Sequence, residues 1–348
     1  MTSLQRVLTT LGHQEPDRVP MFLMLTMHGA KELGLSIQDY FSRAEYVVEG
    51  QLRLRKKYRN DCVVAFLYAS IEVEAWGAEI VYAEDGPPNS GEPFLRKPED
   101  GLQLEIPSVK QTPCLAKVLQ ITKQLKAAVK DETPIIGVVM SPFSLPVMQM
   151  GFEAYLRVMY EKPDLFQRLM QINSEFCVQW ANAQLEAGAT AICYFDPVSS
   201  PTIVPRRQYL RTGWEIAQRT IARFQGPTAI HMASGNCLPI VDDLAQTGTA
   251  VVGSSYVEDL ADVKAACAGR MTVLGNLNGI EMARWSDADA ERHVKDAIAK
   301  AGRGGGYILS DNHGEIPFQV PDSVLSAISE AVHTWGRYPL DWIDAYDG

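Results

Sequence analysis

Two histidines follow short apolar segments of the sequence, and their side chains are suited to acid–base chemistry or metal binding. His231 ends the apolar part of TAIHMASGN (228–236), and His313 follows GYILSD (306–311). A neutral imidazole at the end of a buried strand can ligate zinc or exchange a proton near neutral pH. Each histidine alone could equally be a hydrogen-bonded interior side chain. The spacing leaves these alternatives open, because ligands from separate segments have no diagnostic spacing.

Acidic residues near these histidines could complete such a site. Glu315 lies two residues after His313, and Asp196 follows another apolar segment. Because zinc accepts imidazole nitrogen and carboxylate oxygen, His231 and His313 could bind it with Asp196, Asp311 or Glu315 as the oxygen ligand, and the favoured ligand set is His231, His313 and Glu315. Asp196 precedes a proline and could instead accept hydrogen bonds from a turn or a helix N-terminus.

Further polar and aromatic residues follow other apolar segments. The residues expected to be catalytic are His313, Tyr68 and Asp196. The residues expected to bind substrate are Met27, His28, Ser141, Phe143, Phe195, Asn276 and Asn278. Most of the large apolar side chains near these positions should be core, and the remainder could form the floor of a pocket for a flat apolar ligand. Glu72 and Glu74 also follow an apolar segment, and we expect at least one of them to be exposed on a helix.

The elements that must position these residues are eight apolar segments, which alternate with stretches of helical periodicity. They are VPMFLML (19–25), CVVAFLY (62–68), PIIGVVM (134–140), ATAICYF (189–195), PTAIHM (227–232), TAVVGSS (249–255), MTVLGN (271–276) and GYILSD (306–311). Their near-continuous hydrophobicity is typical of parallel strands covered on both faces. Eight strand–helix units predict a closed (β/α)8 barrel, a TIM barrel, in one domain over residues 1–348. In such barrels the catalytic residues lie at the C-terminal ends of the strands.

Two local patterns refine this prediction. Ser286 and Asp289 predict an N-terminal capping box for a helix that ends at Gly302. The segment 84–107 is rich in proline, glycine and charge, and it predicts an insertion after the second strand. That insertion could be a lid over the site or a surface loop.

The composition limits the partners and the compartment. The chain has 348 residues, of which 46% are hydrophobic and 21% are charged, so it can bury a large core. Its net charge is -10 and its lysines and arginines are dispersed, which disfavours nucleic acid as a partner. Neither a signal-peptide pattern nor an apolar segment of about 18 residues is present, so we expect a cytoplasmic protein without a membrane partner. The six cysteines contain no CxxC pair, which disfavours a cysteine-only zinc site.

Several segments, in this order, resemble the uroporphyrinogen decarboxylase superfamily. They are PDRVP, DCVVAFLYASIEVEAWGAEI, FDPVSSP, IHMASGN, LAQTGTAVVGSSY, VLGNLNG and GYILSDNHGEIP. The resemblance covers nearly the whole chain and implies a single (β/α)8 barrel domain over residues 1–348. It also implies one of two activities, because the superfamily contains tetrapyrrole decarboxylases and zinc methyltransferases that work with corrinoid proteins.

The residues depart from the decarboxylase branch at two places. The decarboxylases carry their essential aspartate where this sequence has Tyr68. They also bind substrate propionates with an arginine-bearing motif, where the matching stretch MLTMHGAK has Leu25 and Gly29. Without those cations a polycarboxylate substrate loses its charge-assisted hydrogen bonds. The resemblance therefore favours the methyltransferase branch, which FDPVSSP and GNLNG also resemble.

The sequence departs from the thiol-activating methyltransferases as well. Those proteins have a His-x-Cys motif and a second, distant Cys. In this sequence His231 matches the motif histidine, but Ala233 stands where the first Cys would be and His313 stands where the distant Cys would be. Imidazole and carboxylate ligands leave zinc harder and more Lewis-acidic, which suits the polarisation of an ether oxygen. We therefore expect an O-demethylase that takes a methyl group from a small donor, favoured as an aryl methyl ether. Its methyl acceptor is expected to be cobalt(I) of a corrinoid, cobalamin, carried by a separate protein.

The expected roles follow from this chemistry. His231 and His313 hold zinc, or His313 protonates the departing oxygen directly. Asp196 or Glu315 completes the coordination or orients an imidazole. Tyr68 donates a hydrogen bond to the leaving oxygen, and two asparagines position the substrate. Those asparagines are Asn276 and Asn278.

Two other functions stay open. One is a metal-independent decarboxylase or lyase that acts on a different substrate with His313 and Tyr68. The other is a noncatalytic protein that binds a corrinoid or tetrapyrrole. The sequence also leaves open whether the barrel forms a homodimer.

Overall fold

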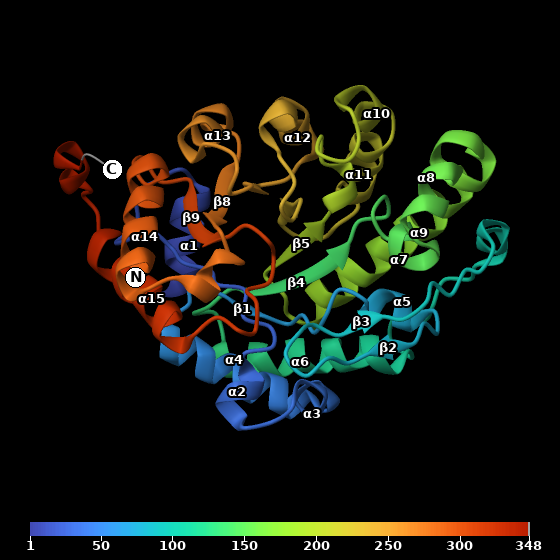
Figure 1. Cartoon of the computed structure of the whole chain (residues 1–348), viewed down its shortest axis with the longest axis horizontal. Helices are drawn as coiled ribbons and strands as arrows, with labels where there is room; N and C mark the ends of the chain where they lie inside the picture. The colour runs from blue at the N-terminus through green and yellow to red at the C-terminus, as the bar shows by residue number, and fades with distance from the viewer. Residues whose placement is uncertain (347–348) are drawn as a thin grey trace.

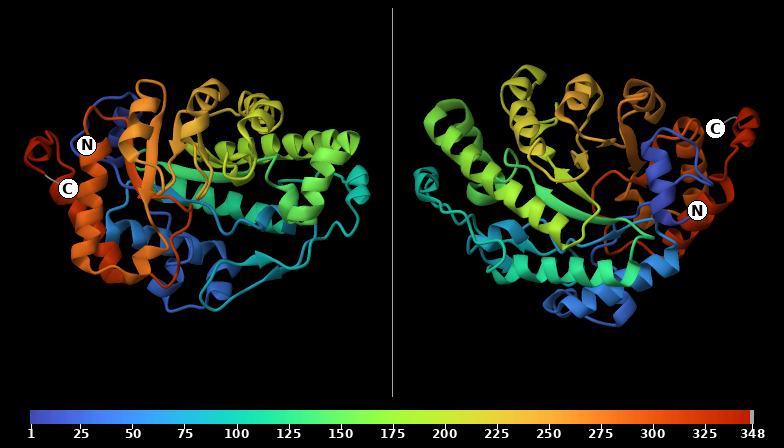
Figure 2. Two further views of the ribbon diagram at one scale, coloured as in Figure 1. Left: turned by 45° about the horizontal axis from the view of Figure 1, so that its top comes forward. Right: turned by 180° about the vertical axis from the view of Figure 1, so that it is seen from behind.

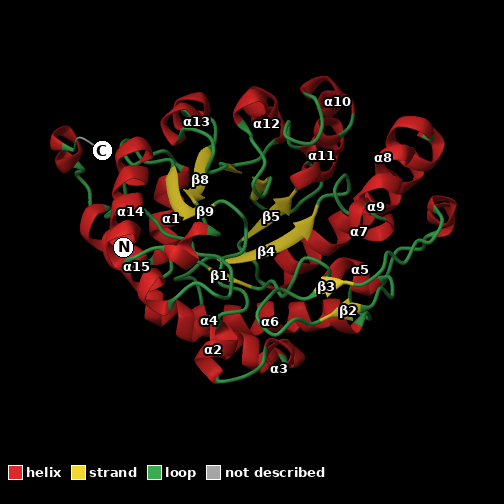
Figure 3. Ribbon diagram, viewed as in Figure 1, coloured by secondary structure: helices red, strands yellow, loops and turns green. Residues whose placement is uncertain are grey.

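Seven parallel strands form one curled sheet, and helices surround its outer face (Figure 1). The computed structural model describes residues 1–346 of the chain. The strands are β1 (Val63–Val64), β4 (Ile135–Met140), β5 (Ala191–Phe195), β6 (Thr228–His231), β7 (Val251–Gly253), β8 (Thr272–Leu277) and β9 (Tyr307–Asp311), and they neighbour one another in this order. The arrangement is an α/β fold of the TIM-barrel type, with the strands at its centre and the helices outside (Figure 3).

The helices vary from one turn to seven turns in length. They are α1 (Ser3–Leu11), α2 (Gly29–Leu33), α3 (Ile37–Ser42), α4 (Ala44–Tyr58), α5 (Ile71–Ala75), α6 (Pro113–Val129), α7 (Pro146–Met150), α8 (Phe152–Glu161), α9 (Pro163–Ala187), α10 (Arg206–Arg211), α11 (Gly213–Ile221), α12 (Val241–Leu244), α13 (Leu260–Cys267), α14 (Asp287–Ala301) and α15 (Asp322–Trp335). The capping box of Ser286 and Asp289 is present at the start of α14, and Gly302 caps its end, as predicted.

The strands are buried on both faces, which explains their near-continuous hydrophobicity. Successive side chains point to opposite faces of a strand. Val138 and Leu274 therefore belong to the apolar cluster inside the curled sheet, whereas their neighbours Val139 and Val273 pack between the sheet and the helices.

The first predicted strand, 19–25, is not a regular strand. It lies beside β9, where Phe22 N–H donates to Leu309 O (2.9 Å) and Leu309 N–H donates to Pro20 O (2.9 Å). Only the pair Met21 and Leu309 forms a β-bridge. Pro20 has no N–H to extend the ladder. Seven of the eight predicted segments thus supply a strand. The remaining segment, residues 19–25, occupies the position between β9 and β1.

Side chains replace the missing ladder on the other edge of residues 19–25. Asn60 accepts a hydrogen bond from Leu23 N–H and donates one to Leu23 O, both at 2.8 Å. Asp61 N–H donates to Met21 O, while the Asp61 carboxylate accepts from Met21 N–H (both 2.9 Å). These two residues lie just before β1, with Cys62 between Asp61 and the strand, so they join the first and second positions of the sheet.

Residues 84–107 come after α5 and after the short strand β2 (Ile80–Val81). They include β3 (Asn89–Ser90), which pairs with β2 in antiparallel orientation. Asp85 O accepts a hydrogen bond from Gln319 in the loop after β9 (2.7 Å). Farther along, the 3-10 helix η1 (Pro98–Gln103) lies beside α8 and α9, away from the centre of the sheet (Figure 2). The segment therefore begins near the C-terminal ends of the strands and ends on the outer helices.

Among residues 1–346, no helix combines the length and the apolar character that spanning a bilayer requires.

Candidate functional site

A cavity of 150 Å³ lies at the C-terminal ends of β4, β5, β6 and β9. Its walls bring together two histidines, two glutamates and several apolar side chains. The lining residues are Met24, Phe66, Ala69, Glu72, Val138, Met140, Cys193, Phe195, His231, His313, Gly314 and Glu315. All three predicted zinc ligands and the predicted substrate-binding residue Phe195 thus line one cavity.

His231 is the last residue of β6, and its ring is held in one orientation. Its Nδ1 accepts a hydrogen bond from Ala233 N–H (3.0 Å), and its ring stacks on Phe195 with the ring centroids 5.6 Å apart. Ala233 has a φ of 50°, so the loop after β6 turns sharply to present this N–H. Burial, together with nearby His313, lowers the pKa of His231 to about 4. The ring is therefore neutral at pH 7 and carries its proton on Nε2, because Nδ1 accepts.

His313 lies in the turn that follows β9. The carboxylate of Asp311, the last residue of β9, accepts hydrogen bonds from the N–H groups of His313 (2.9 Å) and Gly314 (3.1 Å) and so fixes this turn. The His313 ring stacks against Tyr256, and its Nδ1 is buried without a hydrogen-bond partner in the described part of the chain. Burial lowers the pKa of His313 below its usual value, so this imidazole is also neutral at pH 7.

Gly314 allows the turn to pack closely on the rest of the site. Its φ is +90°, and a Cβ there would lie 3.0 Å from Cε2 of Phe195 and 3.6 Å from Cε1 of His231. A glycine is therefore required both by the backbone conformation and by the close approach. The turn places Glu315 in the wall of the cavity that the two imidazoles also line.

The two glutamates of the cavity are protonated at neutral pH. Burial raises the pKa of Glu72 to about 8, and burial together with Asp311 raises the pKa of Glu315 to about 8. One oxygen of Glu72 accepts a hydrogen bond from Met140 N–H (2.8 Å). The other oxygen, Oε2, and Oε1 of Glu315 are buried and have no partner within residues 1–346. Glu315 therefore keeps an oxygen available to a bound molecule.

Glu72 was not among the residues expected from the sequence to form the site. The expectation that at least one of Glu72 and Glu74 is exposed is wrong: Glu72 is 2% exposed, and Glu74 is half-buried. The signal that could have identified Glu72 is its place in the first turn of α5, the first helix after β1.

Two residues predicted to be catalytic do not line the cavity. The Tyr68 hydroxyl donates to Glu74 Oε2 (2.5 Å). Asp196 Oδ1 accepts from the hydroxyls of Ser141 (2.5 Å) and Ser144 (2.7 Å), so the structure places Asp196 in a buried hydrogen-bond network that links the loop after β4 to the end of β5. Ser141, predicted to bind substrate, belongs to this network.

The other predicted substrate-binding residues lie apart from the cavity. Phe143 packs in the core against Tyr155. Met27 is in the core too, and His28 is buried near Phe318, where burial lowers the pKa of the imidazole to about 3. Asn276 and Asn278 line a second cavity of 390 Å³ at the ends of β7 and β8. Asn276 Nδ2 donates to backbone oxygens there, and Asn278 Oδ1 accepts from backbone N–H groups of the following turn.

The predicted zinc ligands share a cavity without forming a ligand set. Among the described residues 1–346, no three His, Cys, Asp or Glu side chains are grouped so that they could hold a metal ion. In His231, Nδ1 accepts from Ala233 and Nε2 carries the proton, so neither nitrogen is free to bind a metal. The residues as arranged do not fit zinc. Zinc stays a prediction, and no step below depends on it.

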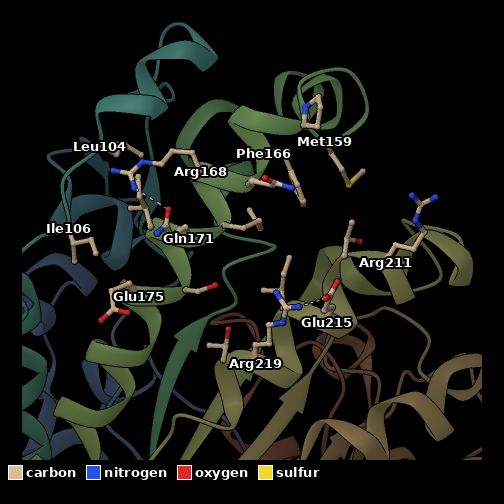
Figure 4. A pocket seen from close by; sticks show the side chains of 18 of the residues that line it. Leu104, Ile106, Met159, Phe166, Arg168, Gln171, Glu175, Arg211, Glu215 and Arg219 are labelled. Carbon is tan, nitrogen blue, oxygen red and sulfur yellow. Dashed lines mark hydrogen bonds and ion pairs between the residues drawn. The ribbon is translucent and has the colours of Figure 1, made fainter.

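A larger groove, of 1290 Å³, lies outside the sheet between α9 and α11 (Figure 4). Its polar side chains contact one another: Arg219 pairs with Glu215, and Arg168 donates to Gln171. Of the residues that the structure describes, those lining this groove include no strand end and no predicted site residue. The smaller cavity, with its buried titratable groups, is therefore the candidate active site.

Comparisons with known proteins agree with this architecture. A family model described as uroporphyrinogen decarboxylase (URO-D) matches residues 2–335. The uroporphyrinogen decarboxylase of Cupriavidus necator is 26% identical over 369 aligned positions, which cover 97% of this chain and 98% of that protein. A methyltransferase from Methanosarcina mazei has a TM-score of 0.85 at 22% identity, covering 96% of this chain and 99% of that chain. A B12-independent methionine synthase from Shewanella sp. W3-18-1 has a TM-score of 0.55 at 12% identity, covering 93% and 98% of the two chains. These two structures are similar in fold.

Proposed function

The chain belongs to the uroporphyrinogen decarboxylase family, and from that premise we propose that it is a methyltransferase that demethylates a small methyl ether, favoured as an aryl methyl ether. The methyl acceptor in this proposal is cobalt(I) of a corrinoid carried by a partner protein. The observation that carries the proposal is a cavity that holds neutral carboxyl groups beside two neutral imidazoles.

The charge of the cavity supports a neutral substrate. None of the described residues that line it is Lys or Arg. A tetrapyrrole that carries several carboxylates would find no charge-assisted hydrogen bonds there. An ether brings no charge into the cavity, so its binding does not require a buried counter-ion.

The neutral carboxyl groups support acid catalysis at an ether oxygen. An alkoxide or phenoxide leaves slowly unless a proton or a metal neutralises its developing charge. Glu315 shares its turn with His313 and has a free, buried oxygen, so we assign it as the general acid. Because its pKa is raised to about 8, Glu315 is mainly in its neutral acid form at pH 7.

The reaction balances with this single proton donor. The bond between the ether oxygen and the methyl carbon breaks, and its electron pair stays on oxygen, which takes the Glu315 proton. The cobalt(I) acceptor supplies both electrons of the new bond to the methyl carbon and is formally oxidised to cobalt(III). Water then returns a proton to Glu315. In this scheme the Nε2–H of His231 donates a hydrogen bond to the substrate, and the Phe195 ring packs against its apolar part.

The proposal is tested by a demethylation assay with purified protein. Guaiacol is the methyl donor, and cob(I)alamin, generated with titanium(III) citrate, is the acceptor. We expect catechol and methylcobalamin to form in equal amounts. We expect the ethyl ether analogue of guaiacol to react far more slowly, because in-line displacement at the primary carbon of an ethyl group is more hindered than at a methyl group. Formation of catechol without methylcobalamin, or formation of neither product from any methyl ether, would contradict the proposal.

A decarboxylase-type lyase is the second candidate, because the curated relatives with 26% identity are uroporphyrinogen decarboxylases. A neutral Glu315 could protonate a carbanion formed by loss of carbon dioxide. Release of carbon dioxide from uroporphyrinogen, with no methyl transfer from ethers, would favour that function. Tight binding of cobalamin without turnover of either substrate would favour the noncatalytic alternative.

A further inference from the structure

A separate chamber, lined mainly by apolar side chains, lies inside the curled sheet, beneath the candidate active site. Its volume is 80 Å³. It is lined by Val7, Leu11, Phe22, Met24, Cys62, Ile136, Ala191, Ile192, Cys193, Pro227, Thr228, Ala229, His231, Ala250, Val251, Leu274, Ile308, Ser310, Asp311 and Gly314. The side chains of α1 close its lower end, and the polar residues Ser310, Asp311 and His231 lie at its upper end.

Small side chains create this chamber. The interior of a (β/α)8 barrel is normally filled by layers of bulky branched residues. Here five positions of the interior have small side chains, so the layers leave space. They are Cys62, Ala191, Cys193, Ala229 and Ala250. An empty space in a core destabilises the fold, because the lining atoms lose contacts.

The chamber and the candidate active site share part of their walls. Met24, Cys193, His231 and Gly314 line both. The active-site cavity therefore lies directly on top of the chamber, and His231 lies at the boundary between them.

The geometry of methyl transfer indicates which part of the substrate faces the chamber. This inference rests on the proposed function. A methyl group is displaced in line, with the acceptor and the leaving oxygen on opposite sides of the carbon. A bulky acceptor can approach only from the open C-terminal end of the sheet. The leaving oxygen therefore lies deeper than the methyl group, and the substituents of the leaving group point toward the chamber.

We propose that the chamber binds an apolar substituent of the methyl donor, so that the preferred substrates are aryl methyl ethers with a short unbranched alkyl group para to the methoxy group. The alkyl group displaces no ordered polar contact, because the lower part of the chamber is apolar. Each methylene buried there should strengthen binding about fourfold until the chamber is full.

The test measures binding of para-alkylphenols, the products of such ethers, by calorimetry at equilibrium. For the wild type we expect the affinity to rise from phenol through para-methyl- and para-ethyl- to para-propylphenol. In Ala229→Leu, which fills the chamber, para-propylphenol should bind at least tenfold more weakly than to the wild type, while phenol changes less than threefold. Ile230→Leu is the matched control, because Ile230 is on the same strand but packs toward the helices. It should follow the wild type.

An affinity that does not rise with alkyl length in the wild type would overturn the inference, as would an unchanged dependence in Ala229→Leu. If Ala229→Leu does not fold, xenon binding to the wild type provides the test, because xenon binds dry apolar cavities. Para-propylphenol should displace xenon, whereas phenol should not, and a protein that binds no xenon would also overturn the inference. Binding requires no turnover, so these results are independent of the demethylation assay: the chamber can fail while demethylation is observed, and the reverse.

Discussion

Glu315→Gln should slow methyl transfer from guaiacol to cob(I)alamin by about 100-fold to 10,000-fold, the usual contribution of a positioned general acid. Glutamine has nearly the same size and can still donate a hydrogen bond, but it cannot release a proton to the leaving oxygen. The cavity should keep its shape, so the affinity for the product catechol should change little. Single-turnover rates, measured by the appearance of methylcobalamin, check this prediction.

Glu74→Gln is the matched control, since Glu74 accepts from Tyr68 and does not line the cavity. This variant should retain nearly the wild-type rate. An equal loss in both variants, or a Glu315→Gln rate within threefold of the wild type, would show that Glu315 is not the acid.

The pH dependence of the wild type follows from the same assignment. Because burial and Asp311 raise the pKa of Glu315 to about 8, the acid form is present below that pH and is lost as the pH rises through it. The single-turnover rate should therefore be highest below pH 8 and fall above it. In Glu315→Gln the remaining rate should lack this fall. A wild-type rate that falls near 4.5, the ordinary value for a glutamate, would contradict the assignment.

Asp61→Ala should lower the free energy of unfolding by about 3–5 kcal/mol, the usual effect of removing one partner of a buried ion pair. The Asp61 side chain is 1% exposed and accepts from Arg6 (2.6 Å) and from Arg18 (2.8 and 3.0 Å), both of which are buried. It also accepts from Met21 N–H, so it holds residues 19–25 beside β1. Its removal leaves the buried guanidinium group of Arg18 without its carboxylate partner and leaves Arg6 paired with the partly exposed Asp17 alone. Denaturant unfolding followed by circular dichroism measures the loss.

Asp17→Asn is the matched control, because it also removes a negative charge next to Arg6. Asp17 also pairs with Arg6, at 2.7 Å, but its side chain is 41% exposed. Exposed ion pairs contribute about 0–1 kcal/mol, so this variant should be much closer to the wild type. Similar losses in Asp17→Asn and Asp61→Ala would mean that the buried network does not join the first position of the sheet to the second.

The sequence was sufficient for most of the architecture, because buried parallel strands leave a strong signal. Seven apolar segments contain strands, but the segment 19–25 does not form one, although its hydrophobicity is the same. The difference comes from Asn60 and Asp61, whose side chains take the hydrogen bonds that a neighbouring strand would otherwise make. Such pairing between side chain and backbone depends on tertiary contacts and has no periodic pattern to detect.

The site was predictable in part for the same reason. His231 and Phe195 lie at strand ends, and their positions follow from the strand pattern. Asp196 is adjacent to Phe195, so it points to the opposite side, where Ser141 and Ser144 hold it. β1 ends at Val64, and beyond this residue the strand pattern gives no orientation for Tyr68. Glu72 was missed because the burial of a carboxyl group depends on the walls around it, and those come from distant segments.

The protonation state of the cavity carboxyl groups is the central claim of this account, and infrared difference spectroscopy measures it directly. Spectra of the wild type at pH 7, minus those of Glu315→Gln, should contain the carbonyl stretch of a neutral carboxylic acid. That band should give way to carboxylate bands as the pH rises through about 8. A spectrum in which Glu315 is already a carboxylate at pH 7 would contradict the account, since no acid would then be present to protonate the leaving oxygen.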